Sequence, residues 1–223
     1  MTMPFAGGID ANANATLIFS LVAAVIYAFT LGMPPSLARS AAKTLAVAML
    51  AVLSTLQGGP LLLVVALALS AVGDAFLSCD GEKAFLGGLA SFLAAHAAYV
   101  ALFLRSGGGT GLLGEPWRGA IVLAMAVFAL AMLAALWRRV GPGLRLPVSV
   151  YVVAILAMGM SALTTSSIWV IAGAVLFMVS DGLLAAEKFL VSAISPQRLW
   201  MRYAVWALYY AAQLGITLGF LLG

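Results

Sequence analysis

Residues 60–78 read PLLLVVALALSAVGDAFLS, and this run decides the class of fold. Nearly all of it is apolar, and one carboxylate, Asp74, interrupts it near its end. A helix that spans a bilayer needs about 20 mainly apolar residues, within a range of about 17–25. Of the 223 residues of the chain, 65% are hydrophobic and 8% are charged. A soluble domain carries roughly 25% charged residues, so the composition predicts an all-α, polytopic membrane protein.

Seven further runs have a similar length and composition, which gives eight expected transmembrane helices. Clusters of glycine and proline separate them, such as Pro34-Pro35, Gly58-Gly59-Pro60 and the glycines of residues 107–111. The expected spans cover about residues 16–33, 42–57, 60–78, 84–104, 118–137, 147–164, 167–187 and 202–222. Together they form one transmembrane domain over residues 1–223.

Lysine and arginine are distributed unevenly between the two sides of the predicted bundle. Nine lie beyond the odd-numbered spans: Arg39, Lys43, Lys83, Arg138, Arg139, Arg145, Lys188, Arg198 and Arg202. The opposite side holds only Arg105 and Arg118. Because positive residues favour the cytoplasmic side, this asymmetry predicts cytoplasmic odd-numbered loops and both termini outside. The chain is therefore expected to be a multi-pass protein of a bacterial inner (cytoplasmic) membrane.

Two local motifs recur about half a chain apart. Asp74 lies in VGDAFL (residues 72–77) and Asp181 in VSDGLL (residues 179–184), and a Glu-Lys pair follows each motif. The aspartates are separated by 107 residues, and His96 and Gln213 in the next spans by 117. Chance recurrence is one explanation in so apolar a chain. The other is a parallel duplication of four helices, with halves of about 16–104 and 118–222.

The two aspartates are the leading candidates for chemistry. A carboxylate inside a bilayer span costs several kcal/mol and usually serves a function. Asp74 and Asp181 lie about 6 Å and 10 Å from the ends of two helices that run in the same direction. Two acids that face one cavity can share a proton, so that one is a neutral acid and the other an ionised base. The alternative is that each makes only a structural hydrogen bond or helix-end contact.

Other polar side chains of the spans are expected to line the same interior. His96 and Tyr99 share a face of the fourth span because they are three residues apart. A lone intramembrane histidine can equally serve only as a hydrogen-bonding group between helices. Deep in the eighth span lie Tyr209, Tyr210 and Gln213. Near the cytoplasmic face, Lys43 and Lys188 are candidate ligands of a lipid phosphate, although most basic residues there only set topology.

Several function classes are disfavoured by what the sequence contains. With one cysteine and one histidine, the chain offers neither an intramolecular disulfide nor a Cys-based or multi-histidine metal site, and no cofactor is expected. The net charge of +4 suits loops on an anionic membrane leaflet, so nucleic acid is not an expected partner. There is no G-x-S-x-G and no H-E-x-x-H. Hydrolysis by a carboxylate pair and water remains.

Several of these motifs together resemble the lysoplasmalogenase family of integral membrane proteins, also called YhhN-like. The resemblance covers nearly the whole chain. It rests on Gly73-Asp74, Phe92-x-x-x-His96-x-x-Tyr99, Leu176-Phe177-x-x-Ser180-Asp181-x-x-Leu184-Ala185 and Tyr209-Tyr210-x-Ala212-Gln213. Lys43 resembles a lysine that opens the family's second span, although Thr44 follows it where the family often has proline.

The resemblance implies a substrate and roles for residues. The family cleaves the vinyl ether of a lysoplasmalogen to a fatty aldehyde and a glycerophospho-ethanolamine or -choline. It implies that Asp74 and Asp181 are the catalytic pair. On this hypothesis, the residues expected to bind the lysophospholipid are Lys43, His96, Tyr99, Ser180, Lys188, Tyr209, Tyr210 and Gln213. Vinyl ether cleavage begins with protonation of the outer carbon and continues with water, as in glycoside hydrolysis. At this point either aspartate can be the acid, either headgroup can be preferred, and the oligomeric state is open.

Three other functions compete with this hypothesis. An intramembrane aspartyl protease also uses two acids on helices, but Ala71 and Ser180 stand where its signature has glycine and tyrosine. A transporter with proton-coupling aspartates suits a parallel repeat, although the acids lie off-centre and no span is clearly broken. A non-catalytic scaffold that binds membrane lipids is the third. Incubation with lysoplasmalogen and detection of free aldehyde separates these alternatives.

Overall fold

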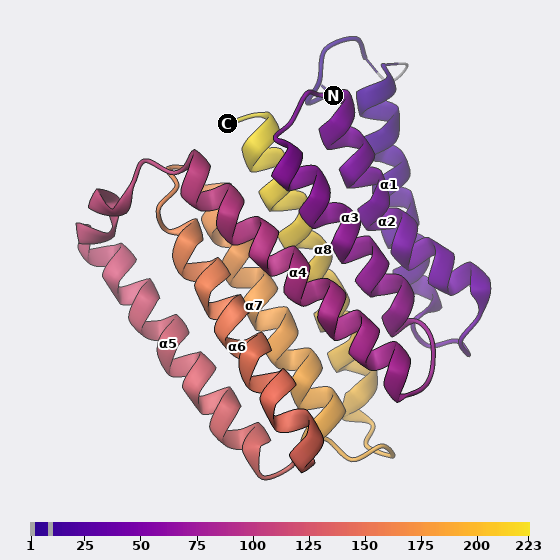
Figure 1. Ribbon diagram of the computed structural model, residues 1–223. Coiled ribbons are helices and arrows are strands. Elements are labelled where there is room, and N and C mark those ends of the chain that lie inside the picture. The colour runs from indigo at the N-terminus through magenta and orange to yellow at the C-terminus, as the bar shows by residue number, and fades with distance from the viewer. Residues whose placement is uncertain (1–2, 9–10) are drawn as a thin grey trace.

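The computed structural model describes residues 3–8 and 11–223, and within them the chain forms an antiparallel bundle of α-helices without β-strands (Figure 1). Successive helices alternate in direction, and both termini lie at the same end of the bundle. The helices are α1 (Asn12–Thr30), α2 (Leu37–Leu56), α3 (Leu61–Leu77), α4 (Glu82–Ser106), α5 (Pro116–Trp137), α6 (Pro142–Ala162), α7 (Ile168–Phe189) and α8 (Gln197–Leu221), with a short 3-10 turn, η1 (Thr110–Gly114), before α5.

The helices have the length and composition of membrane spans. In the part of the chain that is described, seven are long and apolar enough to cross a membrane. The remaining one, α3, is apolar and has 17 residues. The chain is therefore a polytopic helical membrane protein, as predicted, and its eight helices coincide in order with the eight expected spans. The side of the membrane on which the termini lie stays a prediction.

Several helices begin before their predicted starts, because polar and proline residues extend them beyond the apolar runs. Helix α2 begins at Leu37, five residues before the predicted start at 42, and the side chain of Ser36 accepts a hydrogen bond from the Arg39 amide at 3.2 Å. Such a cap satisfies an otherwise unpaired N–H of the first turn. Helix α6 begins at Pro142, where proline suits the first helical position. Pro147, the predicted start of this span, lies inside the helix.

Two helix pairs pack closely through glycine. In the pair α3–α4, a Cβ atom added to Gly73 would lie 2.7 Å from the Phe92 ring. In the pair α7–α8, one added to Gly173 would lie 2.9 Å from the Ala212 carbonyl oxygen. Across the bundle, α4 packs on α6 and α8 packs on α2. If α1–α4 and α5–α8 are equivalent halves related by a two-fold axis, the α4–α6 contact corresponds to the α8–α2 contact. The duplication itself stays a prediction.

Arg118 ties the start of α5 to the end of α6 at the end of the bundle that holds the termini. Its guanidinium is buried and donates hydrogen bonds to the carbonyl oxygens of Leu163 and Thr165. These carbonyls lie at the C-terminal end of α6, where the helix itself provides no donor. The guanidinium also donates to the Glu115 carboxylate at 2.9 Å, which lowers the pKa of that carboxyl below its usual value. Arg118, one of the two basic residues predicted on this side of the bundle, therefore also has a structural role.

Arg118→Ala is expected to lower the free energy of unfolding by about 2–3 kcal/mol, because two buried carbonyls lose a charged donor. For a chain of this size the thermal midpoint in detergent should fall by about 4–12 °C. Arg105→Ala, which removes an exposed arginine at the same end of the bundle, is the control and should shift the midpoint little. Equal midpoints for the two variants would contradict the role given to Arg118.

Candidate active site

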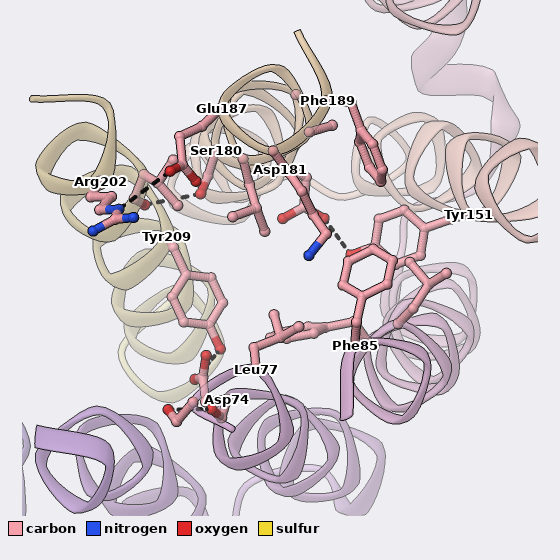
Figure 2. A pocket seen from close by; sticks show the side chains of 18 of the residues that line it. Asp74, Leu77, Phe85, Tyr151, Ser180, Asp181, Glu187, Phe189, Arg202 and Tyr209 are labelled. Atoms are coloured by element: carbon pink, nitrogen blue, oxygen red, sulfur yellow. Dashed lines mark hydrogen bonds and ion pairs between the residues drawn. The ribbon is translucent and has the colours of Figure 1, made fainter. Parts of the chain in front are cut away.

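A cavity of about 460 Å³ lies at the end of the bundle where α3 and α7 finish. All eight helices contribute to its walls, and both Asp74 and Asp181 line it. Figure 2 shows the two acids on opposite walls, Asp74 from α3 and Asp181 from α7. They reach one cavity because the two helices run in the same direction and carry the acids close to their C-terminal ends.

Asp74 is enclosed by two donors from neighbouring helices. Its Oδ1 lies 3.0 Å from the Nζ atom of Lys43, and its Oδ2 accepts a hydrogen bond of 2.7 Å from the Tyr209 hydroxyl. The Asp74 side chain is only 1% exposed and that of Lys43 is 14% exposed. Helix α2 is antiparallel to α3, so a lysine in its second turn lies beside an acid in the last turn of α3. Both the Lys43 cation and the Tyr209 hydroxyl favour the ionised form of Asp74 over the neutral acid.

Asp181 has a different environment. Its Oδ2 accepts a hydrogen bond of 2.5 Å from the Tyr151 hydroxyl, and no lysine or arginine pairs with it within the described residues. The His96 Nε2 atom is 3.8 Å away, beyond hydrogen-bond distance. The Asp181 side chain is 12% exposed, and Figure 2 shows it beside the open space of the cavity. The two acids therefore differ: one is paired with a cation and the other with a neutral donor.

Charged side chains surround the mouth of the cavity. Glu187 is buried and lies 2.7 Å from Arg198 and 3.3 Å from Arg202. The Lys188 Nζ atom sits 3.9 Å from the centre of the Phe85 ring. The charged residues that line this region are Arg39, Lys43, Asp80, Glu187, Lys188, Arg198 and Arg202. With the Lys43–Asp74 ion pair set aside, four cations against Asp80 and Glu187 give the mouth a positive balance. In the described chain, no group of three or more His, Cys, Asp or Glu is placed to hold a metal ion.

A comparison with known proteins decides the family. The model of the YhhN family matches residues 38–220. The chain belongs to the YhhN family. The resemblance inferred from the motifs is thereby confirmed.

Curated relatives of this YhhN protein carry the name lysoplasmalogenase. The one from Mycobacterium bovis is 35% identical over 167 residues, which are 72% of this chain and 60% of that protein. The protein from Mycobacterium tuberculosis has the same values. Human lysoplasmalogenase TMEM86B is 37% identical over 169 residues, 75% of this chain and 66% of its own length. The match thus spans 60% of the mycobacterial relatives' length. No solved structure matches the chain.

Among the family motif residues of this YhhN protein, Tyr209 and Ser180 line the cavity, and Lys43 and Lys188 line it too. The Ser180 hydroxyl donates its proton in a hydrogen bond of 2.9 Å to the Val205 carbonyl oxygen of α8, so it has no proton left to donate to a ligand. Ser180 therefore joins α7 to α8 at the cavity wall.

The other residues predicted to bind the substrate lie behind the wall. The Tyr99 hydroxyl donates to Gln213 Oε1 at 2.5 Å, and Tyr210 shares a hydrogen bond of 2.7 Å with Ser20 of α1. His96 is fully buried, its ring packs against Tyr151 and Phe177, and neither ring nitrogen has a hydrogen-bond partner within the described residues. His96, Tyr99, Tyr210 and Gln213 do not line the cavity, so the structure places them as support for its walls.

Tyr151 and Glu187 are cavity residues with evident roles that were not predicted as site residues. Tyr151 is the hydrogen-bond donor to Asp181, and its polar hydroxyl in an otherwise apolar span required a partner. Glu187 binds Arg198 and Arg202 at the mouth. The recurrent Glu-Lys pair that follows each aspartate was the signal that could have identified Glu187.

Proposed function

We propose that this YhhN protein hydrolyses the vinyl ether bond of a lysoplasmalogen and releases a fatty aldehyde and a glycerophospho-ethanolamine or -choline. The observation that carries the proposal is that Asp74 and Asp181, from α3 and α7, line one cavity with a positively charged mouth and a largely apolar interior. The names of the curated relatives support the same substrate class. We further propose that the enzyme resides in a bacterial inner membrane, with the mouth at the cytoplasmic face.

The different environments of the two acids support different roles. Lys43 neutralises Asp74 at 3.0 Å, so Asp74 is the ionised base. Asp181 accepts a hydrogen bond from Tyr151 through Oδ2, which leaves Oδ1 free to carry a proton toward the cavity. A carboxylic acid presented in this way can act as a general acid. Asp181 is therefore the proton donor and Asp74 the base.

The first step is protonation of carbon. Asp181 transfers its proton to the outer carbon of the C=C bond, and the ether oxygen shares its lone pair with the inner carbon to form an oxocarbenium ion. The Asp181 carboxylate that remains, together with Asp74, stabilises the positive charge that develops. This arrangement parallels the acid and carboxylate pair of glycoside hydrolases.

The second step is the addition of water. A water molecule attacks the inner carbon and gives a proton to Asp74. This addition forms a hemiacetal. The hemiacetal hydroxyl then returns a proton to Asp181, Asp74 protonates the glycerol oxygen, and the C–O bond breaks. The products are the aldehyde and the glycerol hydroxyl, one water molecule is consumed, and both acids regain their starting protonation states.

The position of the cavity suits such a lipid. A lysophospholipid has its phosphate at the membrane surface, and its vinyl ether lies just below it. The cations of the mouth, among them Arg198, Arg202 and Lys188, line the same cavity as the acids. A phosphate held by these cations would place the vinyl ether at the depth of Asp74 and Asp181, which lie within the last turns of their helices.

The proposal is tested with purified protein in lipid nanodiscs. Lysoplasmenylethanolamine and lysoplasmenylcholine should each be tried, and the matched saturated 1-O-alkyl lysolipid is the control substrate. Free aldehyde is expected from the vinyl ether lipids and none from the saturated ether, which cannot form an oxocarbenium ion by protonation of carbon. An absence of aldehyde together with proton-coupled lipid uptake in vesicles would support a transporter instead.

Tyr151→Phe is expected to lower kcat about tenfold with little change in KM, because Tyr151 orients the acid and is not itself the proton donor. Asp181 must be protonated to act, so loss of this hydrogen bond should also displace the alkaline limb of the pH profile of kcat. A purely structural change would lower kcat equally at every pH. Tyr203→Phe, which alters an exposed tyrosine outside the cavity, is the matched control. A Tyr151→Phe enzyme with the rate and pH profile of Tyr203→Phe would contradict this role.

A further inference from the structure

On the side of Asp181, part of the cavity lining is apolar and comes from α5, α6 and α7; we call this part the apolar arm. Its walls are formed by Phe128, Ala129 and Met132 of α5, Val152 and Ile155 of α6, and Met178 of α7. None of these side chains carries a charge or a strong hydrogen-bonding group. A polar ligand group placed here would lose its hydrogen bonds to water without replacement. The arm is therefore suited to hydrocarbon.

Contacts between α5 and α6 bound the arm along its length. Toward the mouth, Leu136 packs with Val140 and Val148 in a small buried cluster. In the other direction, Met125 fills the space beside Gly159, since a Cβ atom added there would overlap the Met125 methyl group. Met125 and Leu136, which bound the arm, lie about 16 Å apart along α5. An occupant that grows longer within these limits must eventually meet the end wall.

Helix α5 separates this arm from the bilayer. It packs on α6 and α7 and lies at the edge of the bundle (Figure 1). Its outer face is apolar and open, with Leu123, Val127 and Leu130 each more than half exposed. The inner face, with Ala129 only 4% exposed, forms the wall of the arm. The arm thus lies within one helix thickness of the lipid, on the side of Asp181 and at a similar depth.

We infer that the apolar arm holds the hydrocarbon chain attached to the reacting ether, and that its end wall selects substrates by chain length. The cations of the mouth, the two acids and the apolar arm line one cavity, so a single-chain lipid with its phosphate at the mouth can extend its chain past Asp181 along the arm. This inference rests on the proposed function for the identity of the lipid. Binding of the chain can be measured separately from cleavage.

Ala129→Leu narrows the arm and is compared with Ala131→Leu, the same substitution at an exposed position of α5 outside the cavity. Vinyl ether lysolipids with chains of about eight and about sixteen carbons are the substrates. Ala129→Leu is expected to lower kcat/KM for the long chain about tenfold or more and to change that for the short chain less than about threefold. Ala131→Leu should leave both values near those of the wild type. Met132→Ala, which removes most of a side chain from the wall and enlarges the space, should raise the relative rate on the longest chains.

Equal losses on both chain lengths in Ala129→Leu, or the same selectivity change in Ala131→Leu, would overturn the inference. If Ala129→Leu does not fold, Met132→Ala decides: unchanged chain-length preference in that variant overturns the inference. Saturated alkyl ether lysolipids, which are not cleaved, provide a binding measurement by thermal shift in nanodiscs. Weaker binding of the long chain in Ala129→Leu without aldehyde release from any variant would support the arm and reject the proposed hydrolysis.

Discussion

Replacing Asp181 by asparagine is expected to lower kcat for aldehyde release about 100- to 10,000-fold, which is the usual contribution of a general acid. The amide has almost the same shape as the acid and can still accept the hydrogen bond from Tyr151, but it cannot give up a proton to carbon. Binding does not require that proton, so KM and the affinity for a saturated ether lysolipid should change little. Initial rates of aldehyde release measure the first effect, and thermal shift measures the second.

The control for this variant is Glu82→Gln. Glu82 is an exposed acid in the first turn of α4, at the same end of the bundle and outside the cavity. Its loss removes one negative charge there and should leave kcat within about twofold of the wild type. If Asp181→Asn retains near wild-type turnover, Asp181 is not the acid.

Breaking the buried ion pair is expected to have the largest effect on stability. Lys43→Met leaves the Asp74 carboxylate, which is 1% exposed, without its cation, and the loss of one partner of such a pair costs about 3–5 kcal/mol. The double variant Lys43→Met/Asp74→Asn leaves neither charge unpaired, so it should recover most of that stability. It should nevertheless remain inactive, because the base is gone. A double variant that regains stability but stays inactive separates the structural role of Asp74 in the ion pair from its catalytic role as the base.

These stabilities are compared as thermal midpoints in the same detergent, with Lys83→Met as the matched control. Lys83 is exposed at the same end of the bundle and does not line the cavity, so its loss should change the midpoint little. A Lys43→Met protein as stable as Lys83→Met, or a double variant no more stable than Lys43→Met, would show that the pair does not hold Asp74 in the way described.

The arrangement of spans follows from the sequence because a bilayer imposes a minimum length on every apolar helix. Eight runs gave eight helices in the right order. The helix starts were less predictable. Ser36 and Pro142 extend α2 and α6 beyond their apolar runs, and hydropathy contains no information about such caps. The 3-10 turn η1 lies in a glycine-rich loop that showed no helical pattern.

The two aspartates of the site were predictable from the sequence. Asp74 and Asp181 stood out because burying an ionised group in a membrane is costly, and both line the cavity. Lys43 was predicted as a ligand of a lipid phosphate, whereas the structure pairs it with Asp74. Neutral polar residues were harder to place. His96 and Tyr99 were correctly assigned to one face of α4, but that face packs against Phe177. The neighbours of a helix face depend on how helices far apart in the sequence are rotated about their axes. The periodicity of a single helix gives no information about that rotation.

The central claim is that Asp181 and Asp74 cleave a vinyl ether by protonating carbon. The most direct test is to run the reaction in heavy water and to trap the released aldehyde quickly for mass spectrometry. Protonation of carbon predicts an aldehyde that carries a single deuterium on the carbon next to the carbonyl group, in an amount that Asp181→Asn nearly abolishes. An aldehyde without deuterium, or no aldehyde from the wild-type protein, would contradict the account.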